Sequence, residues 1–316
     1  MIGAGSPLRK RLARLVPARI AVARSYRRKN PGHRPDLRHP RDWSEKLCWL
    51  KLHGHTPLHA RCADKLEVRG YVADRAGEEV LIPLLFHTDD AEAVTPGAIP
   101  ARQFVLKTTH DSGGVVICRD RDGFDWARAR DFLRWRMGIN YYWNGREPGY
   151  RHLTPRVMAE ALLPSAPGTA LQDYKLWCFH GRVEMIQVMS THAAFGADGF
   201  EGVRGAGDGV SDAFMSRDWA RLPYVLNKPP MPRDPARPRT LERMIALAEA
   251  LSSPFAFVRV DLYDSGGQPW FGEMTFFPSA GTSRFRDPAV ERRLGDLITL
   301  PGPGDQPASS GKSSAA

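Results

Sequence analysis

The feature that most constrains this chain is a segment near its C-terminal end in which two acidic residues face each other. Residues 257–263 and 271–275 alternate between two faces, which is the period of β-strands, and residues 264–269 between them indicate a turn. A hairpin symmetric about Gly267 places Asp261 opposite Glu273. Directly opposed side chains lie roughly 5 Å apart, and like charges there repel. The hairpin therefore predicts a cation between the two carboxylates.

Three cations fit that position. Mg²⁺ binds carboxylate oxygens together with nucleotide phosphates, and Arg259 and Arg284 are the candidates that the chain itself offers. The alternative is an exposed hairpin face whose charges are solvated. The bulky residues that flank the acids favour the metal.

A second segment suits a phosphate group. Residues 104–107 and 115–118 are rich in β-formers, and Lys107 stands near the end of the first of these strands. Ser112, Gly113 and Gly114 follow, so a point charge precedes a loop of unobstructed backbone N–H groups. A glycine-rich hairpin tip is also common without any ligand.

Two further strands carry charged residues. Residues 156–162 indicate an apolar strand that contains Glu160, which could hydrogen-bond a ribose. Residues 173–179 and 182–188 form a hairpin around His180 and Gly181, in which Asp173 and Lys175 share a face. A surface ion pair is the alternative interpretation of those two residues.

The remaining elements are expected as follows. Residues 43–100 are mainly helical with a short strand near 81–86, and helices cover about 125–137 and 240–251. Residues 190–238 are rich in Gly, Asp and Pro and are expected to be irregular, and we expect residues 190–239 to shape an acceptor pocket.

The order of these pieces resembles the ATP-grasp fold, and three stretches resemble the TupA-like ATP-grasp family, named for teichuronopeptide synthesis. They are FVLKTTHDSGG at 104–114, DYKLWCFHG at 173–181, and VRVDLY at 258–263 with FGEMTF at 271–276. Residues 45–47, 64–69 and 71–72 are also similar to that family. The resemblance runs from about 42 to 300 and implies an α+β chain whose two ATP-grasp lobes clasp ATP, preceded by a mainly helical N-terminal region.

The resemblance also implies roles for single residues. The nucleotide-binding residues would be Lys107, Ser112, Gly113, Gly114, Glu160 and Lys175, with Glu160 at the adenosine end. Asp261 and Glu273 would bind Mg²⁺, Lys175 would hold the γ-phosphate or acyl phosphate, and Arg259 would steady the intermediate. Thr275 departs from the general ATP-grasp pattern, in which Asn commonly stands two residues after the metal-binding Glu, whereas TupA-like members resemble this chain there; a hydroxyl is a shorter and weaker ligand than Asn.

Five regions are expected along the chain. A basic leader, flexible or an amphipathic helix, covers 1–41, and a helical region covers 42–100. The small ATP-grasp lobe with the phosphate loop covers 101–160, and the large lobe with the metal site covers 161–300. Residues 301–316 are Pro, Gly, Ser and Ala with few other residues, and indicate a disordered tail.

The charge is concentrated in the leader. The chain has a formal net charge of +10, and twelve basic residues against one acid give the first 41 residues +11, which leaves −1 for the rest. This distribution argues against a general nucleic-acid coat and suits peripheral contact with an anionic membrane or glycan. No apolar run approaches the roughly 18 residues of a membrane span, so the cytoplasm is the expected compartment, with the inner membrane face as a possible place of attachment.

The resemblance implies an ATP-dependent carboxylate–amine ligase that acts through an acyl phosphate with ATP and Mg²⁺. Its setting would be polysaccharide or cell-envelope biosynthesis, with a uronic-acid glycan as the carboxylate and an amino acid as the amine. Two alternatives remain open. One is a non-catalytic ATP-grasp-like protein that docks on an anionic membrane or nucleic acid through its basic arm, and the other is an ATP-dependent kinase.

The four cysteines lie far apart and indicate reduced core residues rather than disulfides. A zinc site formed by Cys48, His53, His55, His59 and Cys62 is the less favoured alternative, because their spacing fits no standard finger.

Overall fold

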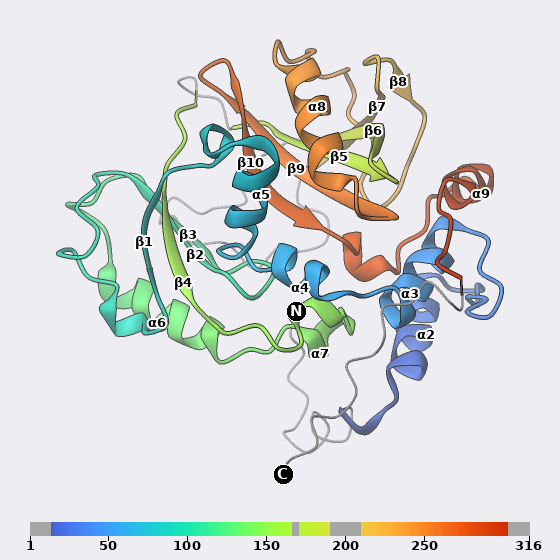
Figure 1. Cartoon of the computed structure of the whole chain (residues 1–316), viewed down its shortest axis with the longest axis horizontal. Coiled ribbons are helices and arrows are strands. Elements are labelled where there is room, and N and C mark those ends of the chain that lie inside the picture. Colours follow the sequence, from blue (N-terminus) through green and yellow to red (C-terminus); the bar gives the residue numbers. More distant parts are fainter. Residues whose placement is uncertain (1–13, 166–170, 190–209, 303–316) are drawn as a thin grey trace.

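The computed structural model describes residues 14–165, 171–189 and 210–302. Residues 1–13 of the leader, 190–209 of the expected irregular region and 303–316 of the expected tail lie outside the described residues. Two antiparallel sheets organise the described chain (Figure 1). No helix within the described ranges is both long and apolar enough to cross a membrane.

The smaller sheet has four strands in the order β1-β4-β2-β3. Its strands are β1 (Leu84–Thr88), β2 (Phe104–Thr108), β3 (Val115–Cys118) and β4 (Val157–Ala161). Helix α6 (Trp126–Met137) connects β3 to β4. Phe104 and Leu106 alternate onto one face of β2 and share a core with Ala129 and Leu133 of α6. Lys107 lies on the other face, so the helix leaves the charged face of the sheet free for other groups.

The larger sheet has six strands in the order β10-β9-β5-β6-β7-β8. Its elements are β5 (Asp173–Phe179), β6 (Arg182–Met189), β7 (Asp212–Ser216), β8 (Arg221–Leu222), helix α8 (Leu241–Ser252), β9 (Phe257–Ser265) and β10 (Gln268–Thr275). The strands β7 and β8 correct the expectation of an irregular region over residues 190–238. Their short sequences carry little strand signal, and pairing with β6 determines their conformation.

The two faces of the larger sheet differ in character. Helix α8 packs on one face, where the Cys178 thiol lies 3.9 Å from the carbonyl oxygen of Ala248. The opposite face carries Trp177 and, two residues earlier on β5, Lys175. The Trp177 end packs against the ring of Trp43, with ring centroids 5.1 Å apart. The Lys175 end is polar, and the sheet thus presents its charged residues beside an aromatic core.

Helices fill the space around the sheets. They are α2 (Ala18–Lys29), α3 (Trp43–His53), α4 (Pro57–Ala63), α5 (Val68–Ala76), α7 (Tyr142–Gly145) and α9 (Pro288–Asp296), with short 3₁₀ turns η1 (Glu78–Val80), η2 (Ala91–Ala93), η3 (Pro148–Tyr150) and η4 (Pro278–Gly281). Helix α4 contacts both η3 and β10, so it joins the η3 turn to the larger sheet.

The described part of the basic leader packs on the body. Val22 and Tyr26 of α2 are buried in a small core with Cys48 of α3. The Tyr26 hydroxyl lies 3.2 Å from Ser44 Oγ and accepts a hydrogen bond from Arg284 Nη1 at 2.8 Å. Of the two interpretations of the leader, a helix therefore describes Ala18–Lys29, and a free solvated arm does not.

Candidate active site

Two facing carboxylates form one edge of the site. Gly266 and Gly267, with φ of +64° and +78°, make a two-residue turn between β9 and β10, and Asp261 pairs with Glu273. The predicted pair is correct, but its register arises differently from the predicted symmetry. The turn is centred between the two glycines, and a bulge at Gly272 then shifts the pairing by one residue.

Gly272 allows this bulge because a side chain would not fit. A Cβ atom there would lie 2.9 Å from the carbonyl oxygen of Asp261 and 3.0 Å from the Tyr263 ring. The close approach of the two strands at this point requires glycine.

The chain supplies its own cations beside Asp261. Arg259 donates from Nε and Nη2 to the two carboxylate oxygens, both at 2.6 Å, and Lys175 Nζ donates to Oδ2 at 2.7 Å. Burial opposes the ionisation of Asp261, but the charges of Arg259 and Lys175 outweigh it and hold the pKa of Asp261 below its ordinary value. Arg259 was one of the two predicted arginines. The other, Arg284, is wrong: it pairs with Asp42 at 3.1 Å, because the chain turns away after β10.

The neighbouring acids are less fully paired. The Glu273 side chain is 43% exposed and lies 3.8 Å from Arg259 Nη2. Thr275 accepts from Arg259 Nη2 at 3.1 Å and donates to Glu273 Oε1 at 3.3 Å, so its hydroxyl positions other side chains. Asp173 pairs with Lys175 through Oδ2, whereas its Oδ1 is buried without a hydrogen-bond partner. Burial raises the pKa of Asp173 despite the lysine.

These acids fit a magnesium ion that shares its ligands with a nucleotide. Among the described residues no three metal-binding side chains are grouped closely enough to hold an ion alone. Mg²⁺ typically takes one or two protein carboxylates and completes its shell with phosphate and water oxygens. Asp261 and Glu273 supply that number, and the unpartnered Oδ1 of Asp173 lies on the same face.

A second charged cluster lies on the smaller sheet. Lys107 Nζ is 2.6 Å from Glu160 Oε2, and Arg69 Nη1 of α5 is 3.0 Å from Glu160 Oε1. All three side chains are less than one-fifth exposed. The structure thus joins two residues that the sequence had placed separately, Lys107 and Glu160, and adds Arg69. No short motif around Arg69 indicates this role, because its partner is 91 positions away.

Side-chain hydrogen bonds of Asp111 and Arg136 fix the glycine loop that follows Lys107. Gly113 and Gly114 have φ of +98° and +72°, the region that glycine enters without strain. Asp111 accepts hydrogen bonds from Thr108 Oγ1 at 2.6 Å and from Arg136 Nε at 2.8 Å. Arg136 also donates to the carbonyl oxygen of Ser112 at 2.9 Å, and the Ser112 side chain itself is exposed. Sequence reasoning missed the anchoring residues Asp111 and Arg136.

Two tyrosines connect the clusters electrostatically. Burial raises the pKa of Tyr263 well above its ordinary value, and Asp173, Glu273, Asp261 and Glu160 raise it further. Tyr263 is therefore within electrostatic reach of the acids of both sheets.

Tyr150 is likewise within electrostatic reach of the phosphate loop and of the larger sheet. Burial raises its pKa, and Glu147, Glu273 and Asp111 add to the shift. Acids of the β9–β10 hairpin, of the smaller sheet and of the phosphate loop thus all act on the pKa values of these two tyrosines.

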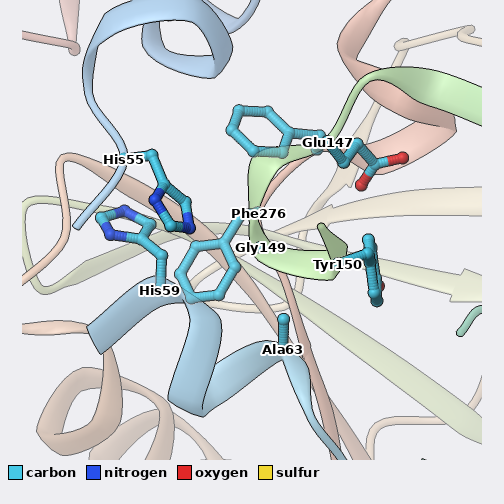
Figure 2. Close-up of a pocket in the computed structure, with 8 residues that line it drawn as sticks. His55, His59, Ala63, Glu147, Gly149, Tyr150 and Phe276 are labelled. Carbon is cyan, nitrogen blue, oxygen red and sulfur yellow. The ribbon is translucent and has the colours of Figure 1, made fainter. Parts of the chain in front are cut away.

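Glu147 is a further acid that sequence reasoning missed. It lies between α7 and η3 and is 7% exposed. Burial raises its pKa to about 7, although Lys51 and Lys29 oppose the shift. Glu147 and Tyr150 also line a cavity of about 10 Å³, the size of one water molecule (Figure 2). The other lining residues are His55, His59, Ala63, Gly149, Phe276 and Phe277.

The zinc alternative is wrong for the described residues. His55 and His59 lie together with ring centroids 5.6 Å apart, but the Cys48 thiol donates to the carbonyl oxygen of Gly281. Cys62 is buried, and burial raises the pKa of its thiol to about 12. No group of three metal ligands forms within the described ranges.

The sequence matches the family model described as TupA-like ATPgrasp over residues 45–197 and 206–299. Among solved structures, the chain is similar to the D-cycloserine synthetase DcsG at 18% identity, with a TM-score of 0.45 over 91% of this chain and 94% of that chain. It is also similar to a D-alanine–D-alanine ligase from Bacillus anthracis at 16% identity, with a TM-score of 0.40 over 75% and 65% of the two chains. No curated protein matches the chain.

Proposed function

We propose that this chain, which belongs to the TupA-like ATP-grasp family, joins a carboxylate to an amine through an acyl phosphate. Its family makes it an ATP-dependent ligase that forms carbon–nitrogen bonds, and ATP-grasp enzymes generally use ATP with Mg²⁺. The acyl phosphate, the substrates and the roles of single residues are the parts that we propose.

The observation that supports this proposal best is the arrangement around Asp261. Lys175, which is buried, and Arg259, whose side chain is 13% exposed, contact a carboxylate beside a half-exposed Glu273. Phosphoryl transfer needs fixed positive charge around the phosphoryl oxygens and a carboxylate pair for the metal. Ion pairs of Asp261 with Lys175 and Arg259 that served only stability would not need a second carboxylate, that of the half-exposed Glu273, opposite Asp261.

Each residue has a role in the proposed reaction. ATP supplies the phosphoryl group that turns the carboxylate into a better electrophile. Asp261 and Glu273 would hold Mg²⁺, and Lys175 and Arg259 would offset the charge of the phosphoryl oxygens and the intermediate.

The smaller sheet would bind the nucleotide. Lys107 would contact its phosphates together with the backbone N–H groups of the loop Ser112, Gly113 and Gly114. Glu160 would lie at the adenosine end. Its present ion pairs with Lys107 and Arg69 keep both cations oriented before a nucleotide arrives.

The substrates are proposed from the family's association with teichuronopeptide synthesis. A uronic-acid glycan would supply the carboxylate and an amino acid the amine, in polysaccharide or cell-envelope biosynthesis. The basic leader would bring the enzyme to an anionic glycan or to the inner face of the membrane.

The test measures ADP release with ATP, Mg²⁺, D-glucuronate or D-galacturonate, and an amino acid. We expect release to require both the acid and the amine, and Glu273→Gln to reduce it roughly 100-fold through loss of charge stabilisation. Glu78→Gln, at an exposed glutamate of η1, serves as the control and should behave as wild type.

Other outcomes would decide for the alternatives. A stable phosphorylated product would identify a kinase. Full turnover by Glu273→Gln would contradict the metal assignment. Absence of ATP binding together with salt-sensitive binding to anionic vesicles would identify a docking protein.

A further inference from the structure

A groove beside helix α2 is lined by arginines whose side chains have no partner among the described residues. Its volume is about 410 Å³, which is the size of sites that hold small ligands. Arg19 and Arg27 belong to α2, and Arg38 belongs to the segment between α2 and α3. No described residue forms an ion pair, a hydrogen bond or a ring contact with these three guanidinium groups. The three cations are therefore available to an anionic ligand.

The residue spacing of α2 leaves room between its two arginines. Arg19, Ala23 and Arg27 are four positions apart, so they share one face of the helix. The rise of an α-helix places the Cα atoms of the two arginines roughly 12 Å apart, with the small side chain of Ala23 between them. Val22 and Tyr26 are buried against the body, which fixes the orientation of this face.

Backbone hydrogen bonds hold the segment that carries Arg38. Asp36 Oδ1 accepts from the backbone N–H groups of Arg38, at 2.8 Å, and of His39, at 2.9 Å. The backbone N–H of Asp36 donates to Glu45 Oε1 at 2.9 Å. Asp36 is the one acid among the described residues that line the groove, so the lining has a formal charge of +2. The groove is thus preformed and positively charged before a ligand arrives.

Aliphatic side chains complete the groove. They are Ile20, Ala23, Pro35 and Leu37, and Ile20 is 44% exposed. Leu15, which precedes α2, is 78% exposed. Figure 1 shows α2 at the edge of the molecule. Exposed aliphatic side chains beside arginines are typical of helices that lie at the surface of an anionic membrane.

The residue types of the lining favour a phospholipid over a glycan or a nucleic acid. A sugar polymer presents hydroxyl groups, which need side chains that both donate and accept hydrogen bonds, and bases of nucleic acids stack on aromatic rings. The described lining residues include no hydroxyl, amide or aromatic side chain. A phospholipid presents a phosphate, which guanidinium groups bind, and glycerol and acyl carbons, which aliphatic side chains cover.

We propose that this groove binds the phosphate headgroups of anionic phospholipids and docks the protein on a membrane surface through α2. The inference rests on the membrane attachment included in the proposed function, and it names the surface and the ligand. It does not depend on the ligase chemistry. Attachment is assigned to an ordered groove with Arg19, Arg27 and Arg38, and not to a loose basic arm.

The test measures co-sedimentation of the full chain with vesicles. Vesicles of phosphatidylcholine with about one-third phosphatidylglycerol are compared with phosphatidylcholine alone. We expect wild type to bind the anionic vesicles and to lose binding as the salt concentration is raised, because salt screens exposed charges. The groove variant Arg19→Gln/Arg27→Gln/Arg38→Gln should bind them about 100-fold more weakly.

A charge-matched variant separates the groove from the net charge of the chain. It removes three arginines that are also exposed, in Arg119→Gln/Arg239→Gln/Arg243→Gln. The first follows β3, and the other two lie at the start of α8, which Figure 1 places away from α2. This variant should bind anionic vesicles within about threefold of wild type, because charges beyond the Debye length are screened. Both variants should unfold at the same temperature as wild type.

Ile20→Ala tests the aliphatic contact, which charge alone would not affect. Loss of half-exposed apolar surface should weaken binding to anionic vesicles by about threefold, at low and at high salt. Leu85→Ala is the matched control, because this leucine of β1 is 36% exposed and lies outside the groove. It should bind as wild type does.

Four results would overturn the inference. They are failure of wild type to bind anionic vesicles, equal binding to vesicles of phosphatidylcholine alone, equal binding by the groove variant and the charge-matched variant, and binding of wild type to soluble polygalacturonate in place of vesicles. The last would identify a glycan as the ligand. Vesicle binding without ADP release would contradict the ligase proposal and leave this inference intact, and ADP release without vesicle binding would do the reverse.

Discussion

Asp261 shows how strongly one residue of this site depends on its neighbours. Asp261 is buried, and both of its carboxylate oxygens accept hydrogen bonds from cations, Arg259 and Lys175. Breaking a buried ion pair from one side leaves an uncompensated charge and costs about 3–5 kcal/mol. A substitution at Asp261 would therefore confuse loss of metal with loss of folding. Glu273 is the better probe, because its side chain is 43% exposed.

Glu147 gives a prediction about stability that needs no substrate. Burial raises its pKa from 4.5 to about 7, so the folded protein retains a proton that the unfolded chain has released between these values. The contribution of this group to stability is thus complete below pH 4.5 and is lost as the pH rises through 7. Glutamine does not ionise. From pH 5 to 8, the unfolding free energy of Glu147→Gln should rise relative to wild type by up to about 3 kcal/mol.

Urea unfolding at several pH values and constant salt measures this difference. Glu78→Gln changes an exposed residue and should show no such trend. A difference between Glu147→Gln and wild type that stays constant from pH 5 to 8 would show that Glu147 is already ionised in the acid range.

At the scale of elements, the hairpin of β9 and β10 brings the two facing carboxylates together. Alternation along each strand put Arg259, Asp261, Glu273 and Thr275 on one face, and the structure confirms their pairing. The bulge at Gly272 could not be predicted from the alternation. It depends on the close approach of the Tyr263 ring and the opposite backbone.

Gly272→Ala tests whether the bulge holds the site in register. The added methyl group would lie 2.9 Å from the Asp261 carbonyl oxygen, so the strands must shift. We expect the unfolding free energy to fall by about 1–3 kcal/mol. We also expect the rate of ADP release to fall under conditions in which the variant is still folded. Gly123→Ala is the control, since its methyl group would meet nothing within 4 Å. Wild-type stability and turnover in Gly272→Ala would mean that the edge tolerates another register.

At the scale of the whole molecule, the basic leader is partly built into the body. The excess charge of +11 lies in residues 1–41, and the described helix α2 ends in Arg27, Arg28 and Lys29. The same helix connects to the segment after β10, where Asn30 Nδ2 donates to the carbonyl oxygen of Thr282 at 2.8 Å. Attachment to an anionic surface stays a prediction, but such a surface would meet a helix that contacts the segment after β10.

Tyr26→Ala tests this docking. The ring is fully buried, and its hydroxyl interacts with Ser44 and Arg284, so we expect a loss of about 3–5 kcal/mol in unfolding free energy. Arg24→Ala, at an exposed position of the same helix, should change it by less than about 0.5 kcal/mol. Denaturant unfolding measures both values. If Tyr26→Ala lowered the unfolding free energy as little as Arg24→Ala does, α2 would contribute little to the stability of the body.

The sequence by itself determined what depends on near neighbours. Alternation along the strands predicted the facing pair Asp261 and Glu273, and the order of motifs predicted the family and the fold. Such patterns are visible because strand and helix periods repeat within a few residues.

Only the tertiary structure decided which distant charges meet. Lys175 reaches Asp261 across 86 positions, and Arg69 reaches Glu160 across 91. Glu147 becomes an enclosed acid because a strained turn and the segment after β10 surround it. Burial and the field of neighbouring charges set the chemistry of these groups, and both arise from packing between elements that no local pattern encodes.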